Sequence, residues 1–314
     1  METQKQINHT IARQEAMGSI MLFTTALIWG LAFIAQRVGM DYIGPFTFNT
    51  MRCIIGGICL VICIYFINKA NGNTVVKHEH ENPKMLLLGG FFCGLALFGG
   101  MSFQQLGIAD TSVANAGFIS TLYIVIVPIL GLFMGKKAGL NIWIGVVFAM
   151  AGLGLLCFKE SLSIQQGDLY ILISAMFYSF HILIVGYFSP RVDGVKMSCL
   201  QFFVAGIFSS VMMFAKETPT ISGILSSWIP LLYVGVLSTA LGYTFQIIGQ
   251  KHTDPTIASL LLSLESVFAV IMGWLILGET LTMQEFFGCA LVFVSVISAQ
   301  IPIDKFKKKN KLQK

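Results

Sequence analysis

Charged side chains are scarce in this chain. Asp, Glu, Lys and Arg together make up only 11% of its 314 residues, whereas soluble domains average about 25%. Hydrophobic residues make up 55%, and the mean hydropathy is +0.78. This composition excludes one or two soluble domains, whose surfaces need more charge. It favours a bundle of membrane helices of about twenty residues each, the length that crosses a hydrocarbon core of about 30 Å.

Signatures of enzyme chemistry are also missing from the sequence. No Gly-rich phosphate-binding loop follows a strand-like segment, which argues against direct use of ATP. A membrane-embedded enzyme that acts on lipid would need a nucleophile with a base, or a metal cluster, at one membrane depth. We find no serine elbow, no Cys/His cluster and no paired aspartates. The run His78-Glu79-His80-Glu81 lacks the His-Glu-x-x-His spacing of a zinc helix, so we interpret it as a solvated loop. We therefore expect no catalytic residue, no metal and no cofactor.

We also expect no cysteine pairs, no signal peptide and no output domain. The cysteines lie in or beside apolar stretches without Cys-x-x-Cys spacing, and we expect them to be small buried hydrophobes: Cys53, Cys59, Cys63, Cys93, Cys157, Cys199 and Cys289. No small-residue cleavage site follows the polar segment Met1–Met17, so we expect the first apolar segment to stay in the mature protein. A membrane sensor would usually carry a soluble output domain, and the tails are too short for one.

What the sequence does contain is a series of ten charge-poor segments. We expect helices at 18–36, 46–68, 85–107, 112–135, 140–158, 168–188, 197–215, 228–250, 255–278 and 284–302. Lysine and arginine give their direction, because cytoplasmic loops are enriched in them. With a cytoplasmic N-terminus, the inner segments hold 16 of these residues and the outer loops hold three: Arg37, Lys159 and Lys216. We therefore expect both termini in the cytoplasm. The basic tail from Lys305 to Lys314 is interpreted as an anchor beside anionic lipid, not as a nucleic-acid site.

The ten segments form two copies of one five-helix unit. Residues 111–145 align with 254–288 at a spacing of 143, and two further spacings hold upstream. The matches at 143 are Ser120/Ser263, Gly135/Gly278 and Gly145/Gly288; those at 142 are Phe103/Phe245, Gln104/Gln246 and Gly107/Gly249; those at 149 are Gly18/Gly167, Ala26/Ala175 and Gly57/Gly206. An odd number of spans per copy inverts the second copy in the membrane, and inverted repeats are typical of alternating-access transporters.

The predicted fold is thus an all-α polytopic membrane protein with ten transmembrane helices in two inverted five-helix repeats. We expect a cytoplasmic N-terminal tail at 1–17, the first repeat at 18–158, the second repeat at 167–302 and a basic cytoplasmic tail at 303–314. No outer loop is long enough to form a domain, so the functional groups must lie within the membrane.

Several passages resemble a known family. They are Trp29-Gly30, Arg52, Leu237-Ser238-Thr239-Ala240, Tyr243-Thr244-Phe245-Gln246, Leu264-Glu265-Ser266-Val267, Gly273-Trp274 and Leu277-Gly278-Glu279. Over residues 18–302 the chain resembles the EamA-type members of the drug/metabolite transporter superfamily. The resemblance implies an exporter or exchanger of small metabolites or drugs in the bacterial plasma (inner) membrane, with a central cavity lined by both halves. Two positions depart from the pattern: Gly135-Lys136 replaces the usual Gly-Glu, and Ser266 replaces a proline, which argues against a helix break there.

Two ionisable residues lie within predicted spans. Glu265 is about ten residues into the ninth span, where an unpaired charge is expensive. It is a candidate for binding a substrate amine or carrying a proton, and the alternative is a neutral carboxyl bonded to another helix. Arg52 lies about two turns from the outer end of the second span. It either snorkels to the interface or anchors a loop, or it binds a substrate carboxylate.

Aromatic and polar side chains at comparable depths complete the candidate site: Trp29, Asn115, Tyr123, Tyr178, His181, Tyr243 and Gln246. Together they resemble a mostly apolar pocket with a few orienting groups, although each can equally be structural, because polar groups in lipid need partners. The expected partners are a small-molecule substrate, the lipid bilayer and protons as a coupling ion. The alternatives to a transporter are a sensor or assembly partner without transport activity and a lipid-modifying enzyme.

Overall fold

The computed structural model describes residues 2–70, 82–111, 113–136, 138–157, 165–277 and 281–300. Every regular element in these ranges is a helix. The run His78–Glu81, the pair Gly278-Glu279 and the basic tail at 303–314 lie outside the described residues.

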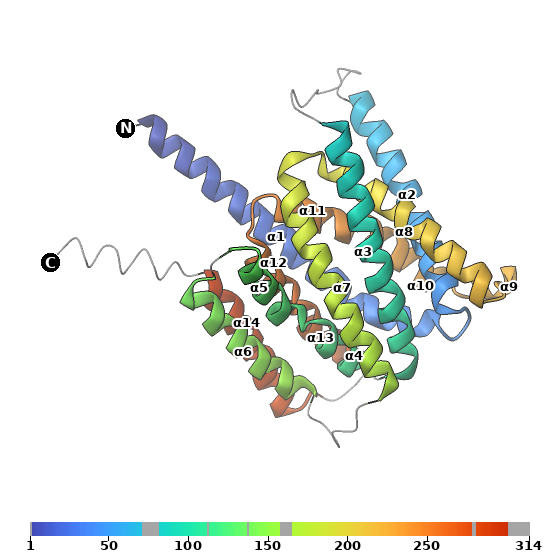
Figure 1. Ribbon diagram of the computed structural model, residues 1–314. Helices are drawn as coiled ribbons and strands as arrows, with labels where there is room; N and C mark the ends of the chain where they lie inside the picture. Colours follow the sequence, from blue (N-terminus) through green and yellow to red (C-terminus); the bar gives the residue numbers. More distant parts are fainter. Residues whose placement is uncertain are drawn as a thin grey trace.

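The first half of the chain builds five spans. They are α1 (Glu2–Gly39), α2 (Pro45–Ala70), α3 (Pro83–Asp110), the pair α4 (Val113–Ser120) and α5 (Tyr123–Phe133), and α6 (Leu140–Cys157). The first helix begins well before the expected residue 18, because it continues through the polar N-terminal segment (Figure 1).

The second half repeats this order. Its elements are α7 (Gln166–Phe188), η1 (Ser189–Arg191), α8 (Gly194–Lys216), α9 (Ile221–Ser226), α10 (Trp228–Leu232), η2 (Tyr233–Tyr243), α11 (Thr244–Gln250), α12 (Pro255–Leu262), α13 (Leu264–Leu277) and α14 (Met283–Gln300). The elements α10, η2 and α11 follow one another as one span, of which η2 is a π-helix.

Ten spans follow from these elements. Eight are long and apolar enough to cross a membrane, and the two shorter apolar helices, Leu140–Leu156 and Met283–Ala299, complete the set. Large apolar side chains cover the outside of the bundle; Phe133 is 85% exposed and Phe214 is 74% exposed. A soluble monomer would not present such a surface, whereas lipid covers it. The predicted all-α polytopic membrane fold is confirmed.

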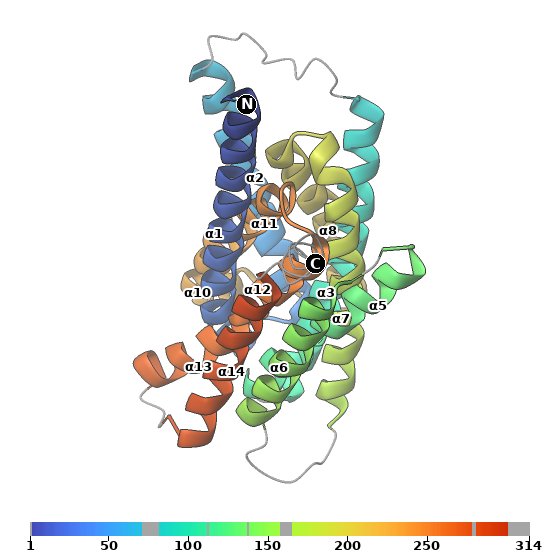
Figure 2. The ribbon, with the colours of Figure 1, turned by 90° about the vertical axis from the view of Figure 1, so that its left-hand side faces the viewer.

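The relation between the two copies is clearest where α6 and α14 pack side by side (Figures 1 and 2). The Asn141 side chain donates to the Ala299 carbonyl oxygen at 2.8 Å, and the Gln284 side chain donates to the Leu155 carbonyl oxygen at 2.8 Å. Each donor is at the start of one helix and each acceptor is near the end of the other, so the helices are antiparallel. Asn141 and Gln284 are 143 apart, the spacing of the repeat. A two-fold axis perpendicular to these helices therefore relates the copies, as an inverted repeat requires.

Two pairs of glycines repeat this symmetry elsewhere. A Cβ atom on Gly107 would lie 2.7 Å from the Gly167 carbonyl oxygen, which brings α3 against α7. A Cβ atom on Gly18 would lie 2.8 Å from the Gly249 carbonyl oxygen, which brings α1 against α11. These contacts are equivalent under the spacings 149 and 142. Close backbone approach at small residues is how helices pack in lipid.

The fourth and ninth spans are interrupted at equivalent depths. The break between α4 and α5 falls at Thr121 and Leu122, and the break between α12 and α13 falls at Ser263. The second break was not expected, because Ser266 replaces the family's proline. It occurs three residues earlier, at Ser263, whose hydroxyl bonds to the Leu260 carbonyl at 2.8 Å. Ser266 instead joins the two spans, since its hydroxyl donates to the Gly117 carbonyl at 2.8 Å.

Candidate functional site

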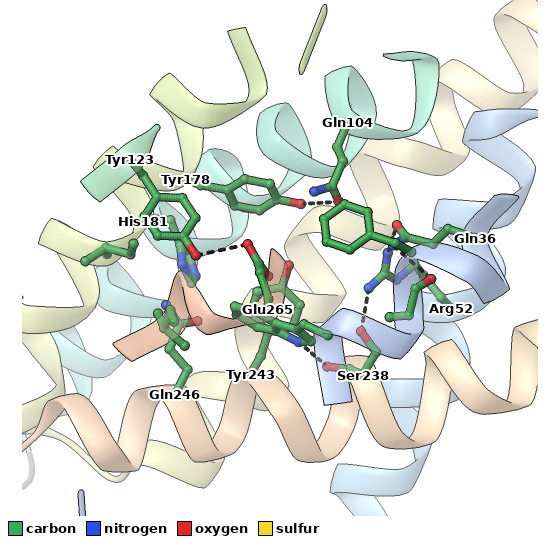
Figure 3. A pocket seen from close by; sticks show the side chains of 15 residues that line it. Gln36, Arg52, Gln104, Tyr123, Tyr178, His181, Ser238, Tyr243, Gln246 and Glu265 are labelled. Atoms are coloured by element: carbon green, nitrogen blue, oxygen red, sulfur yellow. Dashed lines mark hydrogen bonds between the residues drawn. The ribbon is translucent and has the colours of Figure 1, made fainter. Parts of the chain in front are cut away.

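A cavity lies at the centre of the bundle, beside the interruptions in both spans. It holds about 450 Å³ of atom-free space, a volume that includes space open to the outside. Both copies contribute to its wall: Trp29, Ala32, Phe33, Gln36, Arg52, Gln104, Tyr123, Tyr178, His181, Ile182, Ser238, Tyr243, Gln246, Leu262 and Glu265 (Figure 3).

Eight of the nine site residues named from the sequence line this cavity: Trp29, Arg52, Tyr123, Tyr178, His181, Tyr243, Gln246 and Glu265. Asn115, in α4, is not among the lining residues. The sequence reasoning missed Gln36, Gln104 and Ser238. Two of them carried a signal: Gln104 is the repeat partner of Gln246, and Ser238 lies in a passage that resembles the family. Gln36 carried none, because its position is apolar in the second copy.

Glu265 lies in the first turn of α13, directly after the interruption at Ser263. Its side chain is 5% exposed, and Oε1 accepts a hydrogen bond of 2.9 Å from the Tyr123 hydroxyl of α5 (Figure 3). A carboxyl at a helix N-terminus is favoured by the helix dipole. Gly30 lets α1 approach this turn, because a Cβ there would lie 2.7 Å from the Glu265 carbonyl oxygen. The break thus positions an acid at the centre of the bundle.

Arg52 points into the bundle. Its guanidinium is buried, with 2% of the residue exposed, and does not snorkel to the interface. It donates to the Thr239 hydroxyl at 3.0 Å, the Gln36 side-chain oxygen at 3.1 Å and the Ser238 hydroxyl at 3.3 Å (Figure 3). The snorkelling interpretation is therefore wrong: helices α1 and η2 supply closer partners than the interface does.

Aromatic rings form much of the wall between these two ionisable groups. The rings of Trp29 and Tyr243 lie 4.6 Å apart, and the Trp29 indole donates to the Ser238 carbonyl oxygen at 3.1 Å. On the opposite wall, the Tyr178 hydroxyl donates to the Gln104 side-chain oxygen at 3.0 Å. These bonds fix the rings in orientation, so the cavity has a preorganised aromatic surface that suits an organic solute.

His181 and Gln246 lie on the third side of the cavity. His181 is 1% exposed; its Nε2 lies 3.0 Å from the Gln201 side-chain oxygen, and its ring meets Tyr243 edge to face. The Gln246 side-chain oxygen is buried and has no hydrogen-bond partner among the described residues. A solute group that donates a hydrogen bond would satisfy it.

The wall follows the two-fold symmetry in position but not in chemistry. Trp29, Ala32 and Phe33 correspond to Tyr178, His181 and Ile182 at a spacing of 149, and all six line the cavity. Gln104 and Gln246 correspond at 142. The ionisable residues break the symmetry, because the counterpart of Glu265 is Leu122 and the counterpart of Arg52 is Gln201.

Comparisons with known proteins agree with this architecture. The model of the EamA-like transporter family matches residues 16–158 and again residues 165–299. An uncharacterized transporter of Archaeoglobus fulgidus is 30% identical over 287 residues, which covers 90% of this chain and 85% of that protein. The uncharacterized transporter YoaV of Bacillus subtilis is 26% identical over 281 residues, and the match covers 86% of this chain and 92% of YoaV.

A solved crystal structure shares the fold, with a TM-score of 0.74 at 18% identity, over 91% of this chain and 96% of that one. The uncharacterized inner membrane transporter YedA of Escherichia coli is 21% identical and covers 88% of both chains. The two matches to one family model account for both five-helix copies. The chain belongs to the EamA-like transporter family.

Proposed function

We propose that this protein is a secondary transporter that works by alternating access and carries a small organic solute across the membrane. The observation that supports this most directly is Glu265, a buried acid at a helix interruption inside a central cavity. Discontinuous helices that meet at the interface of inverted repeats are where such transporters bind substrate and coupling ions.

In this proposal the two halves rock against each other about the cavity. Helices α4 and α5 pack on α13 and α12 respectively, so the two interruptions face each other across the pseudo-two-fold axis. A carboxyl there exchanges a proton or a cationic group of the substrate at each turnover, since leaving it charged and unpaired in lipid would be costly. Trp29, Tyr178 and Tyr243 supply the walls.

We propose that both termini lie in the cytoplasm and that the protein resides in the bacterial plasma membrane. The 16-to-3 distribution of lysine and arginine supports this orientation. The loops at Met40–Gly44 and Glu217–Thr220 then lie on the outer side.

A carboxylate ties these two outer loops together. Glu217 accepts hydrogen bonds of 2.8 Å from the backbone nitrogens of Phe46 and Thr47 and one of 2.6 Å from the Thr47 hydroxyl. It caps the N-terminus of α2, where the preceding residue, Gly44, has no side chain to do so. We propose that this bond set breaks whenever the outer side opens.

The experiment that tests the transport proposal is a metabolite-release comparison. Cells that overproduce the protein are compared with empty-vector cells and with cells that produce Glu265→Gln at the same level. Solutes that accumulate outside cells with the unaltered protein, but not outside empty-vector cells, are its substrates, and the Glu265→Gln strain shows whether their release depends on this carboxyl group. Equal metabolite profiles from all three strains, whether the solute gradient points into or out of the cell, would count against a transporter and favour a sensor or assembly partner.

A further inference from the structure

Arg52 has uncharged partners only. Its hydrogen bonds go to two hydroxyls and one amide oxygen, and no carboxylate of the described residues forms an ion pair with it. A buried guanidinium without an anion is expensive in a membrane. The other copy shows that the position does not need the charge for packing, since its counterpart there is Gln201.

The two hydroxyls that face Arg52 come from the π-helix η2 (Tyr233–Tyr243). Glycine contacts at the two ends of the third and eighth spans explain why this segment is a π-helix. A Cβ on Gly94 would meet the Val204 Cβ at 2.6 Å, and a Cβ on Gly235 would meet the Ile55 Cβ at 2.8 Å. Val204 and Ile55 are repeat partners at 149, so Gly94 and Gly235 are partners too, at a spacing of 141.

At the other end of the same helices the spacing is 142, because Gly107 and Gly249 make the equivalent glycine contacts. Gly107 lies thirteen positions after Gly94, whereas Gly249 lies fourteen positions after Gly235. The eighth span thus contains one more residue than the third between the same two contacts. A π-helix takes more residues per turn than an α-helix, and η2 lies where the extra residue must be accommodated.

The extra residue of the eighth span lies where the side chains of the two copies differ in polarity. With the spacing of 141 that holds at the Gly94/Gly235 end, Leu97 corresponds to Ser238. With the spacing of 142 that holds at the Gly107/Gly249 end, it corresponds to Thr239. Leu97 is fully buried in an apolar cluster with Cys199 and Phe202. The eighth span of the second copy is therefore longer by one residue and presents two hydroxyls to Arg52 of the first copy. At the equivalent place the third span has Leu97, and the counterpart of Arg52 is Gln201.

We propose that Arg52 and Ser238 form an oxyanion subsite of the cavity, which binds a carboxylate or phosphate group of the substrate, and that Thr239 positions the Arg52 guanidinium. A guanidinium offers a planar fork of donors that matches either group, and hydroxyls complete its hydrogen bonds. Arg52 and Ser238 line the same cavity as Glu265 (Figure 3), whereas Thr239 is fully buried and contacts Arg52 from outside the cavity lining. The assignment rests on the proposed transport function, because it takes this cavity to be the substrate pathway.

The test measures binding and not transport. The thermal unfolding midpoint of the purified protein is recorded in acetate, in phosphate and in chloride at one ionic strength, with acetamide as the uncharged analogue of acetate. A bound anion stabilises the folded state. We expect acetate or phosphate to raise the midpoint above that in chloride and acetamide to leave it unchanged; which anion acts distinguishes a carboxylate from a phosphate substrate.

Two variants identify the site. Arg52→Gln installs the residue that the other copy tolerates, and it should weaken anion binding by about ten-fold or more, the effect of losing a charge-assisted hydrogen bond. Deletion of Leu237, which is 39% exposed, gives the eighth span the thirteen-residue spacing of α3. The deletion variant should fold but lose the anion response, whereas its matched control, Leu237→Ala, should keep both.

A missing anion response in the unaltered protein, or a response that Arg52→Gln retains, overturns the subsite. Failure of the transport proposal gives a different pattern. In that case the anion response and its loss in Arg52→Gln persist, while the metabolite-release profiles of producing and empty-vector cells are the same.

Discussion

Gly18 and Gly249 face each other so closely that a Cβ atom on either would lie 2.8 Å from the carbonyl oxygen of the other. This reciprocal contact joins α1 to the end of the eighth span, on opposite sides of the boundary between the two copies. Its partner contact, between Gly107 and Gly167, joins α3 to α7 in the same way. Four glycines therefore seal the two halves along symmetric seams, and side chains at any of them would force the helices apart.

The first prediction concerns these seams. Gly249→Ala should lower the free energy of unfolding by about 1–3 kcal/mol, the usual effect of overpacking, because the added methyl group meets backbone that cannot yield. Gly57→Ala is the matched control, since the nearest atom to a Cβ there is 3.6 Å away, on a Phe203 ring. The measurement is the unfolding midpoint of the purified variants in detergent. If both variants unfold alike, the glycine seam does not determine stability.

The second prediction concerns Glu265. Glu265→Gln keeps the shape of the side chain but removes its ability to release a proton, so the variant should insert and fold normally while transport loses its pH dependence. Transport is measured between about pH 6 and pH 8, on the substrate identified by the release screen. Glu15→Gln, which changes an exposed acid in the N-terminal part of α1, is the control. Normal pH-dependent transport by the Glu265 variant would make that residue structural.

The third prediction concerns the bonds between the outer loops. Glu217→Ala removes the cap of α2, which is worth about 0.5–2 kcal/mol, and should shift the protein towards an outward-open state. A cysteine at Ala32 in the cavity wall, in a background without the native cysteines, should then react faster with a membrane-impermeant thiol reagent added outside intact cells. Asp41→Ala is the control, because Asp41 is an exposed acid on the neighbouring loop. An unchanged labelling rate would mean that Glu217 does not hold the outer side closed.

The fourth prediction is the orientation in the membrane. Reporter fusions at Gly72 and Lys314, both outside the described residues, should read cytoplasmic, and a fusion at Thr218 should read extracytoplasmic. The reason is the concentration of lysine and arginine in the segments that we assign to the inner side. An extracytoplasmic reading at Lys314 would contradict the even number of spans.

The sequence by itself determined the ten spans, the two copies and most of the cavity wall. The spans follow from local composition, because about twenty apolar residues in a row have no other stable environment than lipid. The cavity residues could be found because polar side chains are rare in such spans, so Glu265, Arg52 and Gln246 stood out against their neighbours. The comparison between copies added Gly18/Gly167 and Gly107/Gly249, whose contacts the structure then revealed.

Only the tertiary structure decided what each polar group contacts. The direction of Arg52 depends on Thr239, which lies 187 residues further along the chain, and no local pattern encodes that pairing. Asn115 has the same composition signal as Gln246 but a different place in the packing. The break at Ser263 and the π-helix at Tyr233–Tyr243 were likewise not predicted from the sequence and became visible only in the structure. Hydrophobicity is a property of each segment alone, whereas the partner of a buried polar group is set by whichever helix packs against it.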